Sequence, residues 1–301
     1  MIYTVTFNPA LDYAMRVENL EPGMTNRSSS EQILPGGKGL NVSTILTHLG
    51  IENTALGFIA GFTGKEIERL FKESGCRSDF IELDRGISRI NVKLKAGDET
   101  EINAVGPEID AAALEKLMSQ LDKLKEGDIL VLAGSIPHSL PDSLYSDIMS
   151  RLSRRGIMFA VDATKDLLMN VLKYKPFLIK PNNHELGEIF GVTLRTREEV
   201  VPYARKLIEK GAVNVLVSMA GEGAVLVTQS GETIDRPAPK GQVRNSVGAG
   251  DSMVAGFIAG WCESQNSLHA FKMGIAAGSA SAFSDELATK EEIEQVYSRI
   301  G

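Results

Sequence analysis

The sequence predicts an α/β fold with a mostly parallel central sheet, helices on both faces of that sheet, and a small β-sheet that projects as a lid. Short runs rich in Val, Ile and Leu, typical of buried parallel strands, alternate with segments of helical apolar spacing. Repeated βα units of this kind form a parallel sheet that is covered on both sides. A separate stretch, residues 89–95, alternates strictly between polar and apolar residues, which indicates a strand with one wet face.

The expected strands of the main sheet are spread along the whole chain. The first, residues 2–7, runs into Pro9, where regular strand pairing stops. The other expected strands are residues 55–59, 128–134, 157–161, 177–179 and 213–217. Helical spacing predicts helices at residues 42–49, 64–74, 112–124, 141–154, 198–209, 267–283 and 289–298. Because no repeat or flexible linker separates these elements, we expect a single domain over residues 1–301.

The lid is expected to come from two segments inserted in this domain, at about residues 12–34 and 86–105. Residues 89–95 and 99–103 flank a short glycine-containing turn, which predicts a hairpin. A similar polar and apolar alternation at 13–17 would add another strand. Such a sheet could close over a ligand, contact a second subunit, or do both.

Composition excludes several classes of function. The chain has 301 residues, a formal net charge of −7 and an isoelectric point near 5.3, so nucleic acid and anionic membrane surfaces are not expected partners. The N-terminal segment lacks the basic region and cleavage site of a secretion signal, so we expect a cytoplasmic protein. Only Cys76 and Cys262 are present, which indicates neither a disulfide framework nor a zinc site.

The segment 245–252 predicts a glycine-led start of a helix. Gly248, Ala249 and Gly250 precede an apolar series at helical spacing, and Asp251 stands in the first turn. Free N–H groups and the helix dipole at such a start favour a bound or developing anion. Asp251 could therefore be a catalytic base, or simply an aspartate that complements the helix dipole.

A second glycine-led helix start occurs at residues 35–41. It contains Gly37 and Lys38 and matches neither a Walker A loop nor a dinucleotide-binding fingerprint. A lysine among glycines can bring a point charge and backbone amides close to a phosphate. By itself this signal is weak.

Polar residues follow several of the expected strands. They are Asp12, Ser135, the segment 180–185 and the segment 218–223. Ligands of open parallel sheets bind beyond the carboxyl ends of the strands, so these residues are candidates for one site. Each also has an ordinary explanation as a turn residue or a helix cap.

Three motifs in this order resemble the ribokinase-like, or PfkB, family of carbohydrate kinases. They are Gly-Gly-Lys-Gly-x-Asn at 36–41, Lys-Pro-Asn-x-x-Glu at 180–185 and Val-Gly-Ala-Gly-Asp-Ser at 247–252. Their order and spacing match the family over essentially the whole chain. The resemblance implies a ribokinase-like fold and ATP-dependent phosphorylation of a sugar hydroxyl. Phe7 stands where the family usually has leucine, and we expect this to be a harmless change in the core.

The resemblance also implies roles for residues on the ATP side of the site. Asp251 would take the proton of the acceptor hydroxyl, and the amides of Gly248, Ala249 and Gly250 would stabilise charge on the transferring group. Lys180 is expected near the nucleotide phosphates, and Glu185, with Asn182 beside it, is expected to hold Mg²⁺ through water. The remaining residues expected on the nucleotide side are Ser218, Gly221 and Gly223.

On the acceptor side, Asp12 and Asn41 match the family positions that bind sugar hydroxyls, and Gly37, in the same motif as Asn41, is also expected to bind the substrate. A phosphorylated sugar also needs cations, because the protein as a whole is acidic. The candidates for its phosphate group are Lys38, Arg89, Arg27 and Ser135. Arg89 suits a lid strand, because a guanidinium can bind phosphate with two hydrogen bonds. Lys93 and Lys95 are expected to be surface charges of the lid.

The substrate and assembly are expectations from the same resemblance. Residues 5–12, 36–39 and 89–94 are similar to the bacterial members of the family that phosphorylate fructose 1-phosphate at its 6-hydroxyl, which gives fructose 1,6-bisphosphate. Tagatose-6-phosphate kinases are near neighbours. A non-catalytic sugar-phosphate sensor on the same fold is an alternative of a different class, although a sensor has no need of a base. A homodimer formed through the lid sheet is also expected, because the outer face of that sheet needs cover.

Overall fold

The main body of the molecule is a nine-stranded sheet. The computed structural model describes residues 1–301, apart from the side chains of Asp98 and Glu99. In spatial order the strands are β13 (Thr233–Arg236), β12 (Ala224–Thr228), β11 (Asn214–Ser218), β10 (Leu178–Ile179), β9 (Met158–Asp162), β8 (Ile129–Ala133), β1 (Ile2–Thr6), β4 (Asn53–Ala60) and β5 (Ser78–Leu83). All neighbours from β11 to β5 are parallel, which confirms the mostly parallel sheet.

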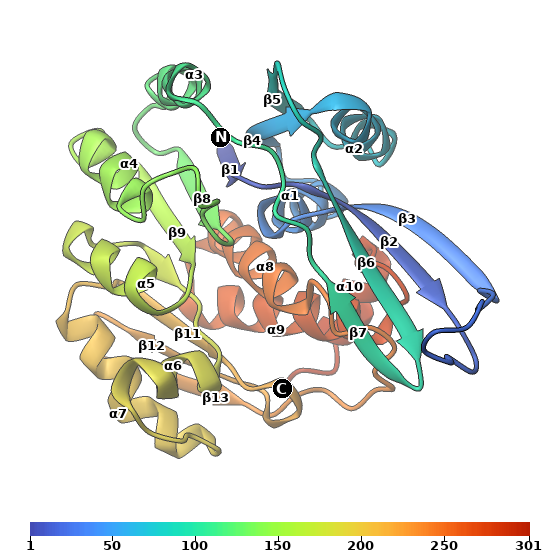
Figure 1. Cartoon of the computed structure of the whole chain (residues 1–301). Helices are drawn as coiled ribbons and strands as arrows, with labels where there is room; N and C mark the ends of the chain where they lie inside the picture. The colour runs from blue at the N-terminus through green and yellow to red at the C-terminus, as the bar shows by residue number, and fades with distance from the viewer.

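Helices cover both faces of this sheet (Figure 1). They are α1 (Lys38–His48), α2 (Gly61–Glu73), α3 (Ala111–Leu121), α4 (Leu144–Leu152), α5 (Lys165–Val171), α6 (Asn183–Phe190), α7 (Arg197–Glu209), α8 (Ala249–Ser264), α9 (Ser267–Phe283) and α10 (Lys290–Tyr297). Alternate residues of a strand enter different cores: Leu130 and Leu132 of β8 pack with α3 and α4, whereas Ile129 and Val131 pack with α1, α8 and α9. Phe7 is buried in the first core, as expected, against Phe58 and Tyr145.

A second sheet projects from the body as the lid (Figure 1). Its strands, in spatial order, are β3 (Ser30–Gly36), β2 (Ala10–Arg16), β6 (Arg89–Ala96) and β7 (Asp98–Ile102). The expected hairpin is present, because β6 and β7 pair antiparallel, while β2 and β6 pair parallel. The predicted combination of a large sheet and a small projecting one is therefore correct.

The two faces of the lid differ in polarity, as the strand registers show. Asp12 of β2 lies opposite Asn91 of β6, on one face. A row of apolar residues crosses the other face from strand to strand, in the order Ile33, Tyr13, Val92 and Ile102. The two residues at the ends of this row, on the edge strands β3 and β7, are 46% and 62% exposed. The apolar face of the lid thus ends in solvent at both edges.

Four strands were not predicted as separate elements. These are β3, β5, β12 and β13. The connection between β11 and β12 contains only the short turn Ala220–Glu222. A parallel pair needs a longer crossover connection, so β12 pairs antiparallel with β11. No helix among the described residues combines the length and the apolar composition that crossing a bilayer requires.

Candidate active site

Asp251 lies in the first turn of α8, at one of the two glycine-led helix starts. Gly248 caps this helix with φ at 77°, in the left-handed region that favours glycine. A Cβ at this position would also come within 2.8 Å of Leu287 Cδ2. The buried carboxylate of Asp251 accepts, at Oδ2, a 2.8 Å hydrogen bond from Nδ2 of Asn41 in α1. This bond joins the two glycine-led helix starts.

A second buried carboxylate, Asp162, connects the two lysines that were predicted for the site. Asp162 ends β9 and is 1% exposed. Its Oδ2 lies 3.2 Å from Lys38 Nζ, and its Oδ1 lies 3.5 Å from Lys180 Nζ. Asp162 was not among the site residues predicted from the sequence. The available signal was its position directly after the expected strand 157–161, at the carboxyl edge of the sheet.

Burial and neighbouring charges change the protonation of this cluster. Burial, followed by the negative charge of Asp162, raises the pKa of Asp251 to about 7, although Lys38, Asn41 and Lys180 act in the opposite direction. Burial also acts to raise the pKa of Asp162, but Lys180 and Lys38 outweigh it and hold that pKa below its usual value. The same burial acts to lower the pKa of Lys38, yet Asp162 and Asp251 keep it above its usual value. The site therefore holds a basic carboxylate beside two charged lysines.

The start of α8 presents backbone N–H groups toward the same cluster. In the described part of the chain, no hydrogen bond uses the N–H of Gly248 or of Gly250, whereas the N–H of Ala249 donates to Ser246 at 3.3 Å. A Cβ on Gly250 would lie 3.2 Å from Lys180 Nζ, so the lysine packs directly against this helix start. The arrangement offers two free amides and an ammonium group to an anion.

The segment Lys180 to Glu185 forms the start of α6. Asn182 caps the helix and accepts a hydrogen bond from the Glu185 N–H, while Glu185 Oε2 accepts one from the Asn182 N–H. The capping explanation of these residues is therefore correct, and it leaves Glu185 Oε1 for another partner. A group of three or more metal-ligating side chains is absent from the described residues.

The other residues expected on the nucleotide side have different surroundings. Ser218 ends β11 beside Asn182. Gly223 has φ at 97°, and a Cβ there would lie 2.0 Å from Arg236 O, so the fold itself requires this glycine. At Gly221, by contrast, no atom of the described residues lies within 4 Å of the position that a Cβ would take. Gly221 is therefore the glycine at which a ligand could approach the backbone.

Asp12 of β2 is held by two side chains of β6. Its Oδ1 accepts a 3.0 Å hydrogen bond from Asn91 Nδ2, and its Oδ2 lies 2.8 Å from Lys93 Nζ. The expectation that Lys93 is a surface charge was wrong, because its side chain is only 14% exposed and pairs with Asp12. A Cβ on Gly36 would lie 2.4 Å from Asp12 Oδ2, so only glycine leaves room for this carboxylate.

Arg89 lies near Asp12 at the base of the lid. Its Nε donates a 3.0 Å hydrogen bond to Asn8 O, which leaves the two terminal nitrogens of the guanidinium to bind a ligand. Burial lowers the pKa of Arg89, and the charge of Asp12 acts in the opposite direction. Gly37 precedes α1 with φ at 130°, and exposed Ser135 follows β8.

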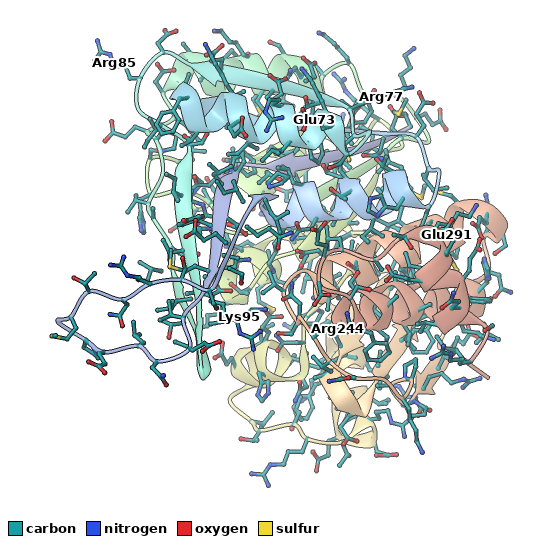
Figure 2. All side chains as sticks on the ribbon, turned by 90° about the vertical axis from the view of Figure 1, so that its right-hand side faces the viewer. Glu73, Arg77, Arg85, Lys95, Arg244 and Glu291 are labelled. Carbon is teal, nitrogen blue, oxygen red and sulfur yellow. The ribbon has the colours of Figure 1, made fainter. Side chains whose placement is uncertain are left out.

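Arg27 is not brought to this cluster within one chain. It is exposed on the loop between β2 and β3, which projects beyond the rest of the lid (Figure 2). Lys95 is also exposed, as expected. Together with Arg16 and with Arg244 of the loop before α8, Lys95 lines a cavity of about 760 Å³ at the outer end of the lid. This cavity is separate from the groups around Asp251.

Comparison with known protein families agrees with this geometry. The model of the pfkB family of carbohydrate kinases matches residues 5–293. The chain belongs to this family. Its fold is thus the ribokinase-like fold, and a chain of this family is a sugar phosphotransferase.

Individual pfkB relatives match the chain over its whole length. A 1-phosphofructokinase of Bacillus subtilis is 47% identical, with 100% of this chain and 98% of the relative covered. A D-tagatose-1-phosphate kinase of Bacillus licheniformis is 35% identical, with 100% and 98% covered. The crystal structure of phosphofructokinase-2 from Escherichia coli in complex with fructose-6-phosphate is 27% identical, with a TM-score of 0.92 and coverage of 99% and 98%.

Side-chain hydrogen bonds and ion pairs connect the three motifs of this pfkB kinase. The first motif reaches the third through the bond between Asn41 and Asp251. The first reaches the second through Lys38, Asp162 and Lys180. All three motifs were predicted from the sequence. Asp162, which lies between Lys38 and Lys180, and Lys93, which pairs with Asp12, were not predicted as site residues.

Proposed function

We propose that the protein transfers the γ-phosphoryl group of ATP to the 6-hydroxyl of D-fructose 1-phosphate, which gives fructose 1,6-bisphosphate and ADP. The observation that carries the proposal is the buried Asp251 carboxylate at the start of α8, with its pKa raised to about 7. A carboxylate with this pKa can accept a proton near neutral pH. The name of the relative at 47% identity supports the choice of acceptor.

In the proposed reaction, Asp251 accepts the proton of the acceptor hydroxyl as its oxygen attacks the γ-phosphorus. The bond from the γ-phosphorus to the bridging oxygen of ATP breaks, and ADP leaves. The free N–H groups of Gly248 and Gly250 are placed to stabilise charge on the transferring group. Lys180, which packs against Gly250, and Lys38 supply positive charge on the same side.

Mg²⁺ is the cofactor expected to accompany ATP. Glu185 has one carboxylate oxygen left after helix capping, and its charge acts on Lys38 at the centre of the site. One carboxylate with few other protein ligands fits Mg²⁺, which keeps several waters and binds substrate phosphates. We therefore assign Glu185, through water, to the ion, which would neutralise charge on the phosphates. Asn182, Ser218, Gly221 and Gly223 would contact the nucleotide.

The acceptor would lie between the lid and α1. Asp12, with Asn41, would receive sugar hydroxyls, since a carboxylate fixed by two donors still has free lone pairs. Arg89 and Lys38 are the proposed cations for the substrate phosphate, and Ser135 and Gly37 line the same end of the sheet. Arg27 could reach a phosphate only from another chain or after the β2–β3 loop moves.

A second candidate acceptor is D-tagatose 1-phosphate, which the name of the relative at 35% identity favours. The experiment is a comparison of kcat/KM for fructose 1-phosphate, tagatose 1-phosphate, fructose 6-phosphate and tagatose 6-phosphate, with ATP and Mg²⁺ held constant. We expect fructose 1-phosphate to give the highest value. A higher value for any of the other three would overturn the assignment, and no turnover with any of them would favour a sugar-phosphate sensor.

A further inference from the structure

Asp162 is a buried charged group that the proposed reaction does not use directly. It ends a central strand of the sheet and is almost completely inaccessible to solvent. Each of its oxygens faces a different lysine, at 3.2 Å for Lys38 and at 3.5 Å for Lys180. The Lys180 contact is long, and Oδ1 has no hydrogen-bond partner among the described residues. Burying a carboxylate with one long contact and one unsatisfied oxygen costs free energy. Packing alone therefore does not explain why Asp162 is buried here.

The two lysines come from segments that are far apart in the sequence. Lys38 belongs to α1 of the first motif, and Lys180 follows β10 in the second motif. Both segments reach Asp251, because Lys180 packs against Gly250, its neighbour in the chain, and α1 contacts Asp251 through Asn41. Without Asp162, these two cations would have Asp251 as their nearest buried anion. A base that is paired with two cations is a weaker base.

We propose that Asp162 is a positioning residue, which holds the ammonium groups of Lys38 and Lys180 beside Asp251 as a counter-charge and so keeps Asp251 free to accept a proton. The inference rests on the proposed function, because it concerns the base of that reaction. The lysines remain available to phosphate oxygens on the side of the α8 start, where Lys180 packs against Gly250.

The protonation of Asp251 follows from the balance of these charges. Its surroundings contribute Asp162 from β9, Lys38 and the amide of Asn41 from α1, and Lys180 from the segment after β10. Asp162 raises the pKa of Asp251, whereas the two lysines and the amide lower it. Neutralising Asp162 should therefore make Asp251 a weaker base, and neutralising Lys180 should make it a stronger one. A purely structural role for Asp162 predicts no fall in the pKa of Asp251 when Asp162 is neutralised.

The test is a titration of the Asp251 carboxyl group in the ligand-free protein. The C=O stretch of a protonated carboxylic acid is followed by infrared spectroscopy over pH, and Asp251→Asn identifies the band. In Asp162→Asn we expect the midpoint to fall by about one pH unit, and in Lys180→Met we expect it to rise. Because no substrate is present, the result does not depend on which sugar phosphate the enzyme uses.

Two controls separate a local effect from damage to the fold. Asp166→Asn removes an exposed carboxylate of α5, four residues after Asp162, and should leave the midpoint unchanged. Circular dichroism and a thermal melt report on folding of each variant. If Asp162→Asn does not fold, the absence of a rise in Lys180→Met would still overturn the proposal. A midpoint that stays at the wild-type value in either folded variant, or that moves in the opposite direction, overturns the proposal.

A kinetic measurement tests the same inference in the working enzyme. In Asp162→Asn, the fall in activity on the acid side of the pH profile should move to lower pH, while kcat falls at least tenfold because the lysines lose their position. The substrates titrate identically with both enzymes, so a difference between the profiles belongs to the protein. A fall in kcat with an unmoved profile would contradict the proposed role.

Discussion

At the scale of single residues, the chemistry of the site depends on the environment of one carboxylate. Asp251 is an ordinary aspartate in the sequence, and burial together with the charge of Asp162 raises its pKa to about 7. The hydrogen bond from Asn41 orients it without cancelling this effect. Desolvation thus gives Asp251 the strength that its proposed role as a base requires, at the point where the helix start also has free amides.

Replacement of Asp251 by Asn should lower kcat by at least about 100-fold, because a neutral amide cannot accept the proton. The side chains are nearly the same size, so binding of the sugar phosphate should change little. Initial rates and equilibrium binding of the substrate to the variant measure these two effects. Activity near that of the wild type would remove Asp251 from the mechanism.

The same carboxylate predicts the pH dependence of the wild-type enzyme. Only the ionised form of Asp251 accepts a proton, and its pKa is raised to about 7. We therefore expect kcat/KM to be half its maximum near pH 7, to be constant above about pH 8, and to fall about tenfold per pH unit on the acid side. The second ionisation of a phosphate group lies near pH 6, so a midpoint near pH 6 would indicate titration of the substrate instead.

The cations of the acceptor site give a prediction with a matched control. Arg89→Ala should raise KM for the sugar phosphate about tenfold or more, with a smaller effect on KM for ATP, because a charged hydrogen bond is lost. Lys95→Ala removes a cation from the same face of β6 at an exposed position and should change neither value. Steady-state kinetics with each substrate varied in turn provide the test. An equal rise in both KM values for Arg89→Ala would indicate a defect of the lid instead.

At the scale of elements, the periodicity of the sequence predicted most helices and most buried strands, because these patterns depend on local burial. The short helix α5 was not predicted. It could not predict β12 and β13, since an antiparallel edge depends on which strand a short turn places alongside β11. Alternation places Lys93 and Lys95 on the same face of β6 as Arg89, but it does not say which of these side chains a neighbouring strand covers. Both lysines were expected at the surface, whereas Lys93 pairs with Asp12 of β2.

The residues of the site also fall into those that the sequence predicts and those that it does not. Glycine-led helix starts are visible in the sequence because the backbone there needs glycine, as at Gly248. Asp162 was missed because its importance comes from two lysines that are 124 and 18 residues away from it in the chain. Contacts between elements of this kind have no local signature.

At the scale of the whole molecule, the lid has one polar face and one apolar face. The polar face carries Asp12, Asn91 and Lys93, which contact one another and belong to the proposed acceptor site. The apolar row on the other face ends at Ile33 and Ile102, which are exposed on the two edge strands of an open sheet. Exposed apolar edge strands favour association with another chain. A second copy of this chain is the occupant that we propose, which gives a homodimer.

The dimer proposal predicts that charge on the apolar face separates the subunits. The double variant Ile33→Asp and Ile102→Asp should be monomeric at concentrations where the wild type has twice the mass, because dimerisation would bury two carboxylates in each subunit. Leu268→Asp, at an exposed apolar position of α9 outside the lid, is the matched control and should leave the dimer intact.

Sedimentation velocity over a range of protein concentrations measures the masses. A wild-type protein that stays monomeric at all of them contradicts the dimer, and a double variant that stays dimeric places the interface elsewhere. If the loop that carries Arg27 also reaches across to the neighbouring site, the monomeric variant should have a raised KM for the sugar phosphate as well.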